Sequence, residues 1–230
     1  MSPTNPATNI PRALTWPWNI ADRLKEIGMF FNGTDPVHMT MRRVAERLEQ
    51  AGISYAIVGG MAVNAHGHQR TTGDVDFLVT AEGFNSFLKL VGSADFDRVP
   101  GRARRFLDRA TAVTFDLLIT GRFPGSGRPG PISFPDPAAV KQQIGNLPYV
   151  NLTTLVQLKL AARRHKDFGD VVELIRAHGL DEAFADKLHP SVRSDYIECL
   201  DEKRREDEYE AREDAAANDL SGGDGADKPS

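Results

Sequence analysis

Hydrophobic positions along the chain recur with two periods, one typical of helices and one typical of strands. Before residue 52 they recur mostly at steps of three and four, which predicts helices over residues 19–31 and from about residue 36. By spacing, the apolar face of the second helix includes Met39, Val44, Leu48 and Ala51. Gly52 is suited to the position just beyond the end of that helix.

Short apolar runs with flanking turn residues then predict the strands of a sheet. These runs are SYAIV (54–58), DVDFLVT (74–80), RRFLD (104–108), AVTFDLLIT (112–120) and PYVNL (148–152). The third and fourth are predicted to form a hairpin with its turn near Ala110-Thr111. Residues 121–137 are rich in Gly and Pro and predict a loop, with a short strand around Ile132 and a helix over 136–144.

Helical patterns return around and after these strands. They cover residues 61–66, 81–91, 153–165 and 167–178, and a longer segment from about residue 190. The predicted fold class is α/β: a small mixed β-sheet flanked by helices, with a helical C-terminal region. The predicted parts are an N-terminal extension with a helix (1–35), a core (36–150), a C-terminal helical region (151–200) and an acidic, partly disordered tail (201–230).

Charge is unevenly distributed, which changes how the net charge of −4 is interpreted. The tail holds eleven acidic and five basic residues, so the rest of the chain carries a small positive balance that does not exclude an anionic substrate. The absence of an apolar run of about 20 residues predicts no membrane span. A single cysteine, Cys199, and an N-terminus without an apolar signal segment favour a cytoplasmic protein.

Two carboxylates interrupt the apolar run 74–80. Side chains two apart in a strand share a face, so Asp74 and Asp76 are predicted to project together while Val75 and Phe77 face the core. Paired carboxylates repel each other, and a divalent cation relieves the repulsion. The alternative is a solvated strand end, or one paired with Arg70.

Asp116 lies in a second apolar run, and burying its charge is costly unless it is paired or bound to a metal. If its strand lies beside 74–80, three carboxylates meet and can hold two metal ions. The alternative is an edge aspartate that faces solvent or an arginine. Gly59-Gly60 lets the backbone approach a bound group, or makes a tight turn only. It is neither a P-loop nor a dinucleotide fingerprint.

The pattern from Gly59-Gly60 through Gly67, Arg70, Thr72, Asp74 and Asp76, followed by a separate strand aspartate, resembles the polymerase-β-type nucleotidyltransferase superfamily. The segment KLAARRHKDFGDVVEL (159–174) is similar to the lysine-containing helix, followed by Lys-Asp-x-x-Asp, of the minimal, abortive-infection (AbiEii-type) toxin-like branch of this superfamily. The resemblance covers about residues 50–178. It implies a metal-dependent enzyme that moves a nucleoside monophosphate from an NTP to an acceptor hydroxyl. The acceptor is a tRNA end, a protein side chain or a small molecule.

The resemblance also implies roles for individual residues. Asp74, Asp76 and Asp116 bind Mg²⁺ (or Mn²⁺), and Asp116 is a candidate base; Gly59, Gly60 and Lys159 contact the phosphates. Arg70 and Thr72 orient the aspartates or the turn, or contact the nucleotide. One departure is Gly60, where serine is frequent in the superfamily. Lys159, Arg163, Lys166 and Asp170 have the spacing of one helix face, alternatively a solvated face with Lys166 paired to Asp170.

Two other functions stay open. One is a nucleotide- or partner-binding module of the same fold without turnover. The other is an RNA-binding protein that uses the stretch 98–109, which holds five arginines and one aspartate but is thin in aromatic residues, with only Phe106 and Phe123 nearby. The toxin-like branch implies a possible antitoxin partner. The acidic tail could cover the arginine-rich hairpin.

Overall fold

The computed structural model describes residues 20–92 and 95–221. Residues 1–19 of the predicted N-terminal extension, and residues 222–230 of the tail predicted to be partly disordered, lie outside the described residues. Within them the chain forms one mixed sheet with the strand order β3-β4-β5-β2-β1-β7-β6. The strands are β1 (Tyr55–Val58), β2 (Asp74–Val79), β3 (Phe96–Arg98), β4 (Arg105–Asp108), β5 (Thr114–Ile119), β6 (Lys141–Ile144) and β7 (Leu147–Val150).

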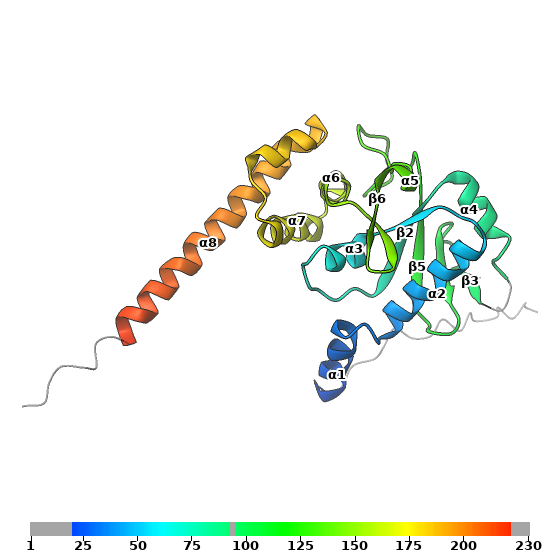
Figure 1. Ribbon diagram of the computed structural model, residues 1–230, viewed down its shortest axis with the longest axis horizontal. Coiled ribbons are helices and arrows are strands. Elements are labelled where there is room, and N and C mark those ends of the chain that lie inside the picture. Colours follow the sequence, from blue (N-terminus) through cyan, green and yellow to red (C-terminus); the bar gives the residue numbers. More distant parts are fainter. Residues whose placement is uncertain (1–19, 93–94, 222–230) are drawn as a thin grey trace, which may run out of the picture.

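Helices flank this sheet, as predicted (Figure 1). They are α1 (Ile20–Phe31), α2 (Pro36–Gln50), α3 (Gly59–Ala65), α4 (Ala81–Leu88), α5 (Pro137–Val140), α6 (Leu152–Ala162), α7 (His165–His178) and α8 (Arg193–Ser221), with 3₁₀ turns at Glu182–Lys187 and Pro190–Val192. The predicted fold class, a mixed α/β fold with a helical C-terminal region, is confirmed.

The strands at the centre of the sheet run in both directions. β2 is antiparallel to β1 and parallel to β5, and β4 closes the predicted hairpin against β5. β7 is parallel to β1 and antiparallel to β6. The two aspartate-bearing strands therefore lie side by side in the middle of the sheet, where neighbouring strands hold their backbones on both sides.

An aromatic cluster anchors one face of the sheet. Five phenylalanine side chains are almost completely buried there, and their rings make mainly edge-to-face contacts: Phe77 and Phe115 from the central strands, Phe87 from α4, Phe96 from β3 and Phe106 from β4. Each such burial contributes about 1.5–3 kcal/mol relative to exposure. This packing fixes which face β2 and β5 turn toward the core, and the opposite face carries the aspartates.

The apolar face predicted for α2 is partly wrong. Met39 is 47% exposed, and Ala51 is also exposed beyond the end of the helix. The buried stripe runs instead through Val37, Met41, Val44 and Leu48, at steps of four, three and four. Met39 precedes Val44 by five residues, which turns its side chain away from that stripe.

The predicted helix over 136–144 is mostly wrong. Helix α5 ends at Val140, and residues 141–144 form β6, which pairs with β7 across a two-residue turn at Gly145-Asn146. Gly145 has φ +59°, which suits glycine and marks a hairpin turn. Ile132 is buried in a loop without a strand, and β3 was not predicted.

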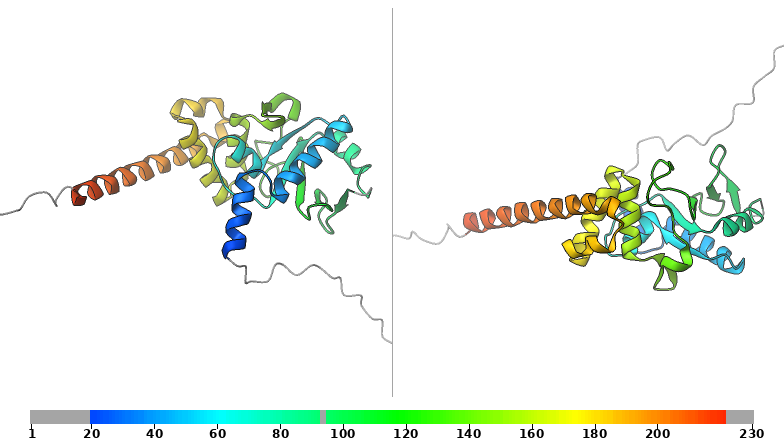
Figure 2. Two further views of the ribbon diagram at one scale, coloured as in Figure 1. Left: turned by 60° about the horizontal axis from the view of Figure 1, so that its bottom comes forward. Right: turned by 90° about the horizontal axis from the view of Figure 1, so that it is seen from above.

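The acidic C-terminal segment is helical through Ser221, as predicted for its first part. Both views show α8 extending away from the body at the end opposite to β3 and α4 (Figures 1 and 2). The hypothesis that the tail covers the arginine-rich hairpin is therefore wrong for residues 201–221. Among the described helices, none combines the length and apolarity needed to cross a bilayer.

Candidate nucleotide site

The pairing of β2 with β5 brings the predicted carboxylates together. Asp74 is in register with Thr114, and Asp76 is in register with Asp116. Val75 and Phe77 are fully buried on the opposite face, as the alternation predicted. Side chains in register on one face lie about 5 Å apart at their Cβ atoms, so Asp74, Asp76 and Asp116 form one acidic cluster at the centre of the sheet.

An arginine that was not predicted as a site residue also lies within this cluster. Arg105, from β4, is in register with Asp116. Its Nη2 atom donates to Asp116 Oδ2 at 2.6 Å and to Asp74 Oδ2 at 2.9 Å, and its Nε atom donates to Asp116 Oδ2 at 3.1 Å. Asp116 therefore faces an arginine, as one alternative predicted. The edge position in that alternative is wrong, because β5 lies inside the sheet.

Asp76 differs from the other two carboxylates because no described cation forms an ion pair with it. Burial, followed by the charges of Asp74 and Asp116, raises the pKa of Asp76 to about 6. The charges of Lys159 and Arg164 oppose this rise only in part. One carboxylate of the cluster thus retains an uncompensated cost of ionisation.

The three carboxylates suit a divalent cation by type, since oxygen ligands are what Mg²⁺ binds. In the arrangement described, however, no three His, Cys, Asp or Glu side chains of residues 20–92 and 95–221 are placed to share a metal ion. Arg105 lies against two of the three predicted ligands. In this arrangement, therefore, Arg105 supplies the positive charge beside Asp74 and Asp116.

The raised pKa of Asp76 leads to a pH-dependent prediction. In the folded state Asp76 ionises near pH 6, whereas an unfolded aspartate ionises near 3.9, so its charge destabilises the fold increasingly between these values and fully above them. In EDTA, Asp76→Asn is expected to raise the melting temperature at pH 7.5. This gain should disappear below about pH 4. Differential scanning fluorimetry across this range tests it, and an equal gain at both pH values would contradict it.

The two glycines at the start of α3 are required by close packing against site residues. A Cβ on Gly59, which has φ +65°, would lie 2.0 Å from Asp76 Oδ2. A Cβ on Gly60 would lie 2.8 Å from the hydroxyl oxygen of Thr72. The absence of serine at residue 60 thus has a physical reason, because Thr72 already places a hydroxyl group there.

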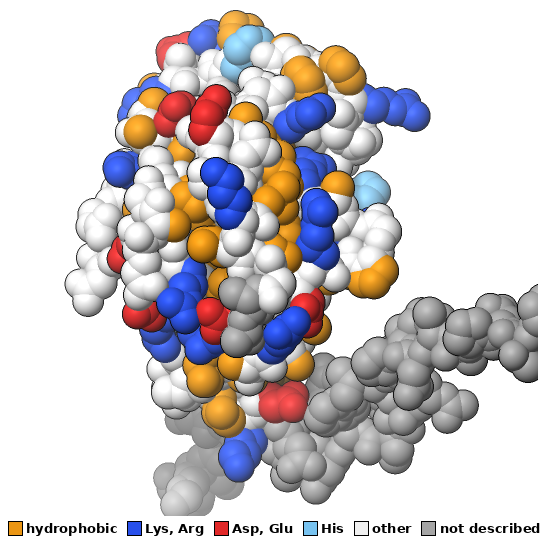
Figure 3. All heavy atoms as spheres, turned by 90° about the vertical axis from the view of Figure 1, so that its right-hand side faces the viewer, with side chains coloured by type: hydrophobic (Ala, Val, Ile, Leu, Met, Phe, Trp, Pro, Cys, Tyr) orange, Lys and Arg blue, Asp and Glu red, His pale blue; other side chains and the backbone are white. Residues whose placement is uncertain are grey.

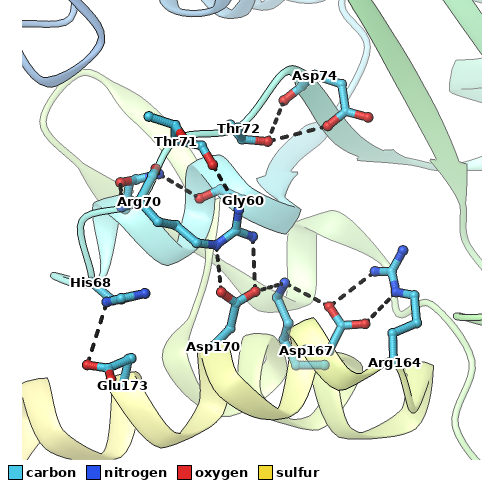
Figure 4. Close-up of polar contacts among 12 residues, drawn as sticks. Gly60, His68, Arg70, Thr71, Thr72, Asp74, Arg164, Asp167, Asp170 and Glu173 are labelled. Atoms are coloured by element: carbon cyan, nitrogen blue, oxygen red, sulfur yellow. Dashed lines mark hydrogen bonds and ion pairs between the residues drawn. The ribbon is translucent and has the colours of Figure 1, made fainter. Parts of the chain in front are cut away.

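A buried ionic network connects α6, α7 and the loop before β2. The Lys159 Nζ atom donates to Asp167 Oδ1 at 3.0 Å and also to Asp170. Arg70 makes two hydrogen bonds to Asp170, at 2.6 and 3.0 Å, and Arg164 pairs with Asp167 (Figure 4). Burial favours the neutral acid at Asp167, but hydrogen bonds and charge from Arg164 and Lys159 outweigh it, so the pKa of Asp167 is lowered.

This network corrects two sequence predictions. Lys159, Arg163, Lys166 and Asp170 do not share one helix face, because α6 ends at Ala162 and Arg163 is left-handed at φ +55°. Asp170 pairs with Lys159 and Arg70 across the turn, and Lys166 is exposed. The idea that Arg70 pairs with the aspartate strand is also wrong. Thr72 lies close to that strand, with its Oγ1 3.4 Å from Asp74 Oδ1.

The acidic cluster opens into a cavity of about 180 Å³, here called the aspartate cavity. Its polar walls are Asp76, Arg104, Asp116, Lys159, Arg164 and Asp167, and its apolar wall includes Leu118, Phe123, Phe134, Leu155 and Leu158. Arg104, Arg164 and Phe123 were not predicted as site residues. Arg104 and Arg164 each belong to a pair of adjacent arginines, Arg104-Arg105 and Arg163-Arg164, in charged segments of the sequence. The periodicity of strands and helices alone did not show which arginine of each pair faces the cavity.

Comparisons with known proteins place this fold only loosely. No family model and no curated protein matches the chain. Among solved structures, it is similar to a proposed nucleotidyltransferase from H. pylori (TM-score 0.41, 14% identity, covering 71% of this chain and 76% of that one). It is also similar to an antigenic nucleotidyltransferase-like protein from Paracoccidioides brasiliensis (0.42, 15%, 71% and 86%) and to JHP933 from Helicobacter pylori (0.36, 13%, 62% and 70%). These TM-scores are below 0.5, so function is inferred from the residues of the site alone.

Proposed function

We propose that this protein is a metal-dependent nucleotidyltransferase that moves a nucleoside monophosphate from an NTP to an acceptor hydroxyl and releases pyrophosphate. The observation that carries the proposal is the register of β2 and β5, which gathers Asp74, Asp76 and Asp116 on one face beside Gly59. The same cavity is lined by the cationic side chains of Lys159, Arg164 and Arg104. Carboxylates beside cations suit a metal-bound triphosphate.

In this proposal the residues of the site have separate roles. Asp74 and Asp76 would hold the divalent cation, which would offset charge on the phosphates. Asp116 accepts the proton of the acceptor hydroxyl, while Thr72 and the backbone at Gly59 and Gly60 contact the phosphate chain. The acceptor class, tRNA or protein, the toxin-like branch and an antitoxin partner stay predictions from the resemblance.

The role of Lys159 in this proposal differs from the phosphate contact that the resemblance implies. It is 5% exposed and already pairs with two buried aspartates. The Arg164 side chain is 56% exposed and lines the same cavity. We infer that Lys159 mainly holds α6 and α7 together, and that Arg164 and Arg104 present positive charge to the phosphates.

The proposal is tested by incubating the full chain with each α-³²P-labelled NTP and Mg²⁺, with and without total tRNA and cell lysate. Transfer of label to an acceptor is expected with at least one NTP. Gel mobility then shows whether RNA or protein carries the label. Failure of every NTP, together with no metal-dependent NTP binding in equilibrium dialysis, would sink the proposal.

A second candidate is a nucleotide- or partner-binding module of the same fold without turnover. It is favoured by one observation, the ion pairs of Arg105 with Asp74 and Asp116, which leave no described metal-holding group. In this candidate Arg105 replaces the metal permanently. In the enzyme it withdraws when metal and nucleotide bind.

Arg105 therefore gives a prediction about metal affinity. Arg105→Gln removes a positive charge in contact with two carboxylates, and Mg²⁺ affinity measured by calorimetry is expected to rise at least about tenfold, or about 1.4 kcal/mol. Arg109→Gln is the matched control, because Arg109 lies on the same hairpin but pairs with Asp97, outside the cluster. Equal Mg²⁺ affinity in wild type and Arg105→Gln would show that Arg105 does not compete with metal.

A further inference from the structure

The end of α8 forms an arm that nothing in the described part of the chain covers. The last ion pair that joins this helix to the body is that of Arg176 with Asp207, and every side chain from residue 208 to residue 217 is exposed. Figures 1 and 2 show this segment standing clear of the body; residues 208–217 are here called the acidic arm. A short helix that packs against nothing is marginal in water, so a surface that covers the arm would also stabilise it.

One face of the acidic arm combines an aromatic side chain with negative charge. At about 100° per residue, this face holds Tyr209, Glu210, Glu213 and Asp214. Among the described residues no basic side chain pairs with these three carboxylates, and the neighbouring Arg212 pairs with Glu208. Tyr209 is 62% exposed, and it is the only exposed large hydrophobic side chain that the structure describes outside α1 and α2. The face thus offers an aromatic ring and three unpaired charges to a partner.

A groove of the opposite charge lies at the other end of the molecule. It has a volume of about 390 Å³, and its walls include Phe84, Arg98, Arg104, Arg122 and Phe123; it is here called the arginine groove. Phe84 lies on α4 and Arg98 on β3, whereas the segment with Arg122 follows β5. Ile119 also lines the groove, and strand alternation turns it to the face of β5 opposite to Asp116. The groove therefore opens on the other face of the sheet from the acidic cluster.

The arginines of this groove lack counter-ions within the chain. None of the described carboxylates forms an ion pair with Arg98, Arg104 or Arg122. Arg105 and Arg109 differ from them, because both pair with aspartates. On the face that carries α4 and β3, Lys and Arg side chains border a band of hydrophobic side chains (Figure 3). A ligand that combines carboxylates with an aromatic ring matches both parts of this surface.

We propose that the acidic arm of one copy of this protein docks in the arginine groove of a second copy. Tyr209 enters the groove between Phe84 and Phe123. The carboxylates of Glu210, Glu213 and Asp214 face the arginines that line it. The contact has to join two molecules, because α8 extends away from the end of its own chain that carries α4 and β3 (Figure 1). The ring contributes apolar burial, and the charges fix the orientation of the arm.

The two surfaces that meet in this contact differ from each other, so the contact is heterologous. A first pair of molecules leaves one arm and one groove free, and further copies add head to tail until a ring closes or a chain forms. Exposed ion pairs each contribute little to the free energy of association. We therefore expect weak association that increases with protein concentration and decreases as salt screens the charges.

The test is the association constant of the full chain, measured by sedimentation equilibrium at low and at high salt. Arg98→Glu/Arg122→Glu reverses charge in the groove, and Glu210→Lys/Glu213→Lys reverses charge on the arm. Each variant alone is expected to lose at least about tenfold in the association constant. An equimolar mixture of the two is expected to associate within about three-fold of wild type, because every arm then finds a groove of opposite charge on the other variant.

Tyr209→Ala is expected to weaken association about five-fold or more, because it removes the ring that enters the groove. Glu26→Lys/Glu46→Lys makes the same charge reversal as the arm variant at exposed positions of α1 and α2, and should change association less than about two-fold. A monomer at every concentration and salt, an equal loss in this control, or a mixture that stays dissociated would each overturn the proposal.

This inference goes beyond the proposed nucleotidyl transfer and does not depend on it. None of the residues changed in the groove and arm variants lines the aspartate cavity. NTP binding by each variant in dilute solution should therefore equal that of the wild type. Lost association together with retained NTP binding then assigns the effect to the contact between arm and groove.

Discussion

Asp74→Asn/Asp76→Asn is expected to lower the rate of nucleotidyl transfer at least about a thousand-fold, on the order of 4 kcal/mol in the activation free energy. Asparagine keeps the size of the side chain but removes the charge with which a carboxylate binds a divalent cation. A metal ion contributes several kcal/mol to stabilising charge in phosphoryl transfer. Both changes lie on one face of β2, opposite the buried Val75 and Phe77, so the core packing is unchanged.

The measurement is the rate of label transfer from the preferred α-³²P-labelled NTP under single-turnover conditions. Asp97→Asn serves as the matched control, because Asp97 lies on β3 and pairs with Arg109 outside the acidic cluster. Circular dichroism should show an intact fold for both variants, since the double variant removes repulsion from the cluster. Transfer by Asp74→Asn/Asp76→Asn at more than about a tenth of the wild-type rate would contradict the role given to these aspartates.

Lys159→Met is expected to destabilise the protein by about 3 kcal/mol, near the lower end of the range of roughly 3–5 kcal/mol for removing one partner of a buried ion pair. The variant leaves Asp167 and Asp170 buried with less positive charge nearby. The loss should not be greater because Arg70 still pairs with Asp170 and Arg164 with Asp167.

Urea unfolding followed by circular dichroism measures this effect. Lys166→Met makes the same change at an exposed position next to Asp167, without an ion pair to the network, and should alter stability by less than about 0.5 kcal/mol. If Lys159→Met were as stable as wild type but unable to bind NTP, Lys159 would be a phosphate contact, as the resemblance implies. The structural role inferred from its burial would then be wrong.

Part of the site could be predicted from the local sequence pattern. The shared face of Asp74 and Asp76 follows from the two-residue period of a strand, and the hairpin turn at Ala110-Thr111 was also predicted. That turn, taken one step further, places Arg105 opposite Asp116. The register of the predicted hairpin therefore indicated that Arg105 lies opposite Asp116. Its side-chain contact with Asp74, which lies two strands away on β2, did not follow from the hairpin.

Other features had no local signal. Two helices were predicted over 153–165 and 167–178, but the exact position of the break depends on a left-handed Arg163, a conformation that an arginine rarely adopts. The segment of β6, Lys141–Ile144, was predicted as helix because its short mixture of polar and apolar residues fits a helix or a strand. Pairing with β7 makes it a strand. Tertiary contacts override such weak preferences.

By itself the sequence determined the mixed α/β class, the face on which Asp74 and Asp76 project and the apolar face opposite them, because these depend on residues only a few positions apart. The tertiary structure decided that Arg105 pairs with two carboxylates, that Lys159 is buried between Asp167 and Asp170, and that Phe84 joins Arg98 and Arg122 in one groove. Contacts such as that of Arg70 with Asp170 join residues a hundred positions apart. Their geometry depends on strand order and helix packing, which the spacing of residues along the chain does not specify.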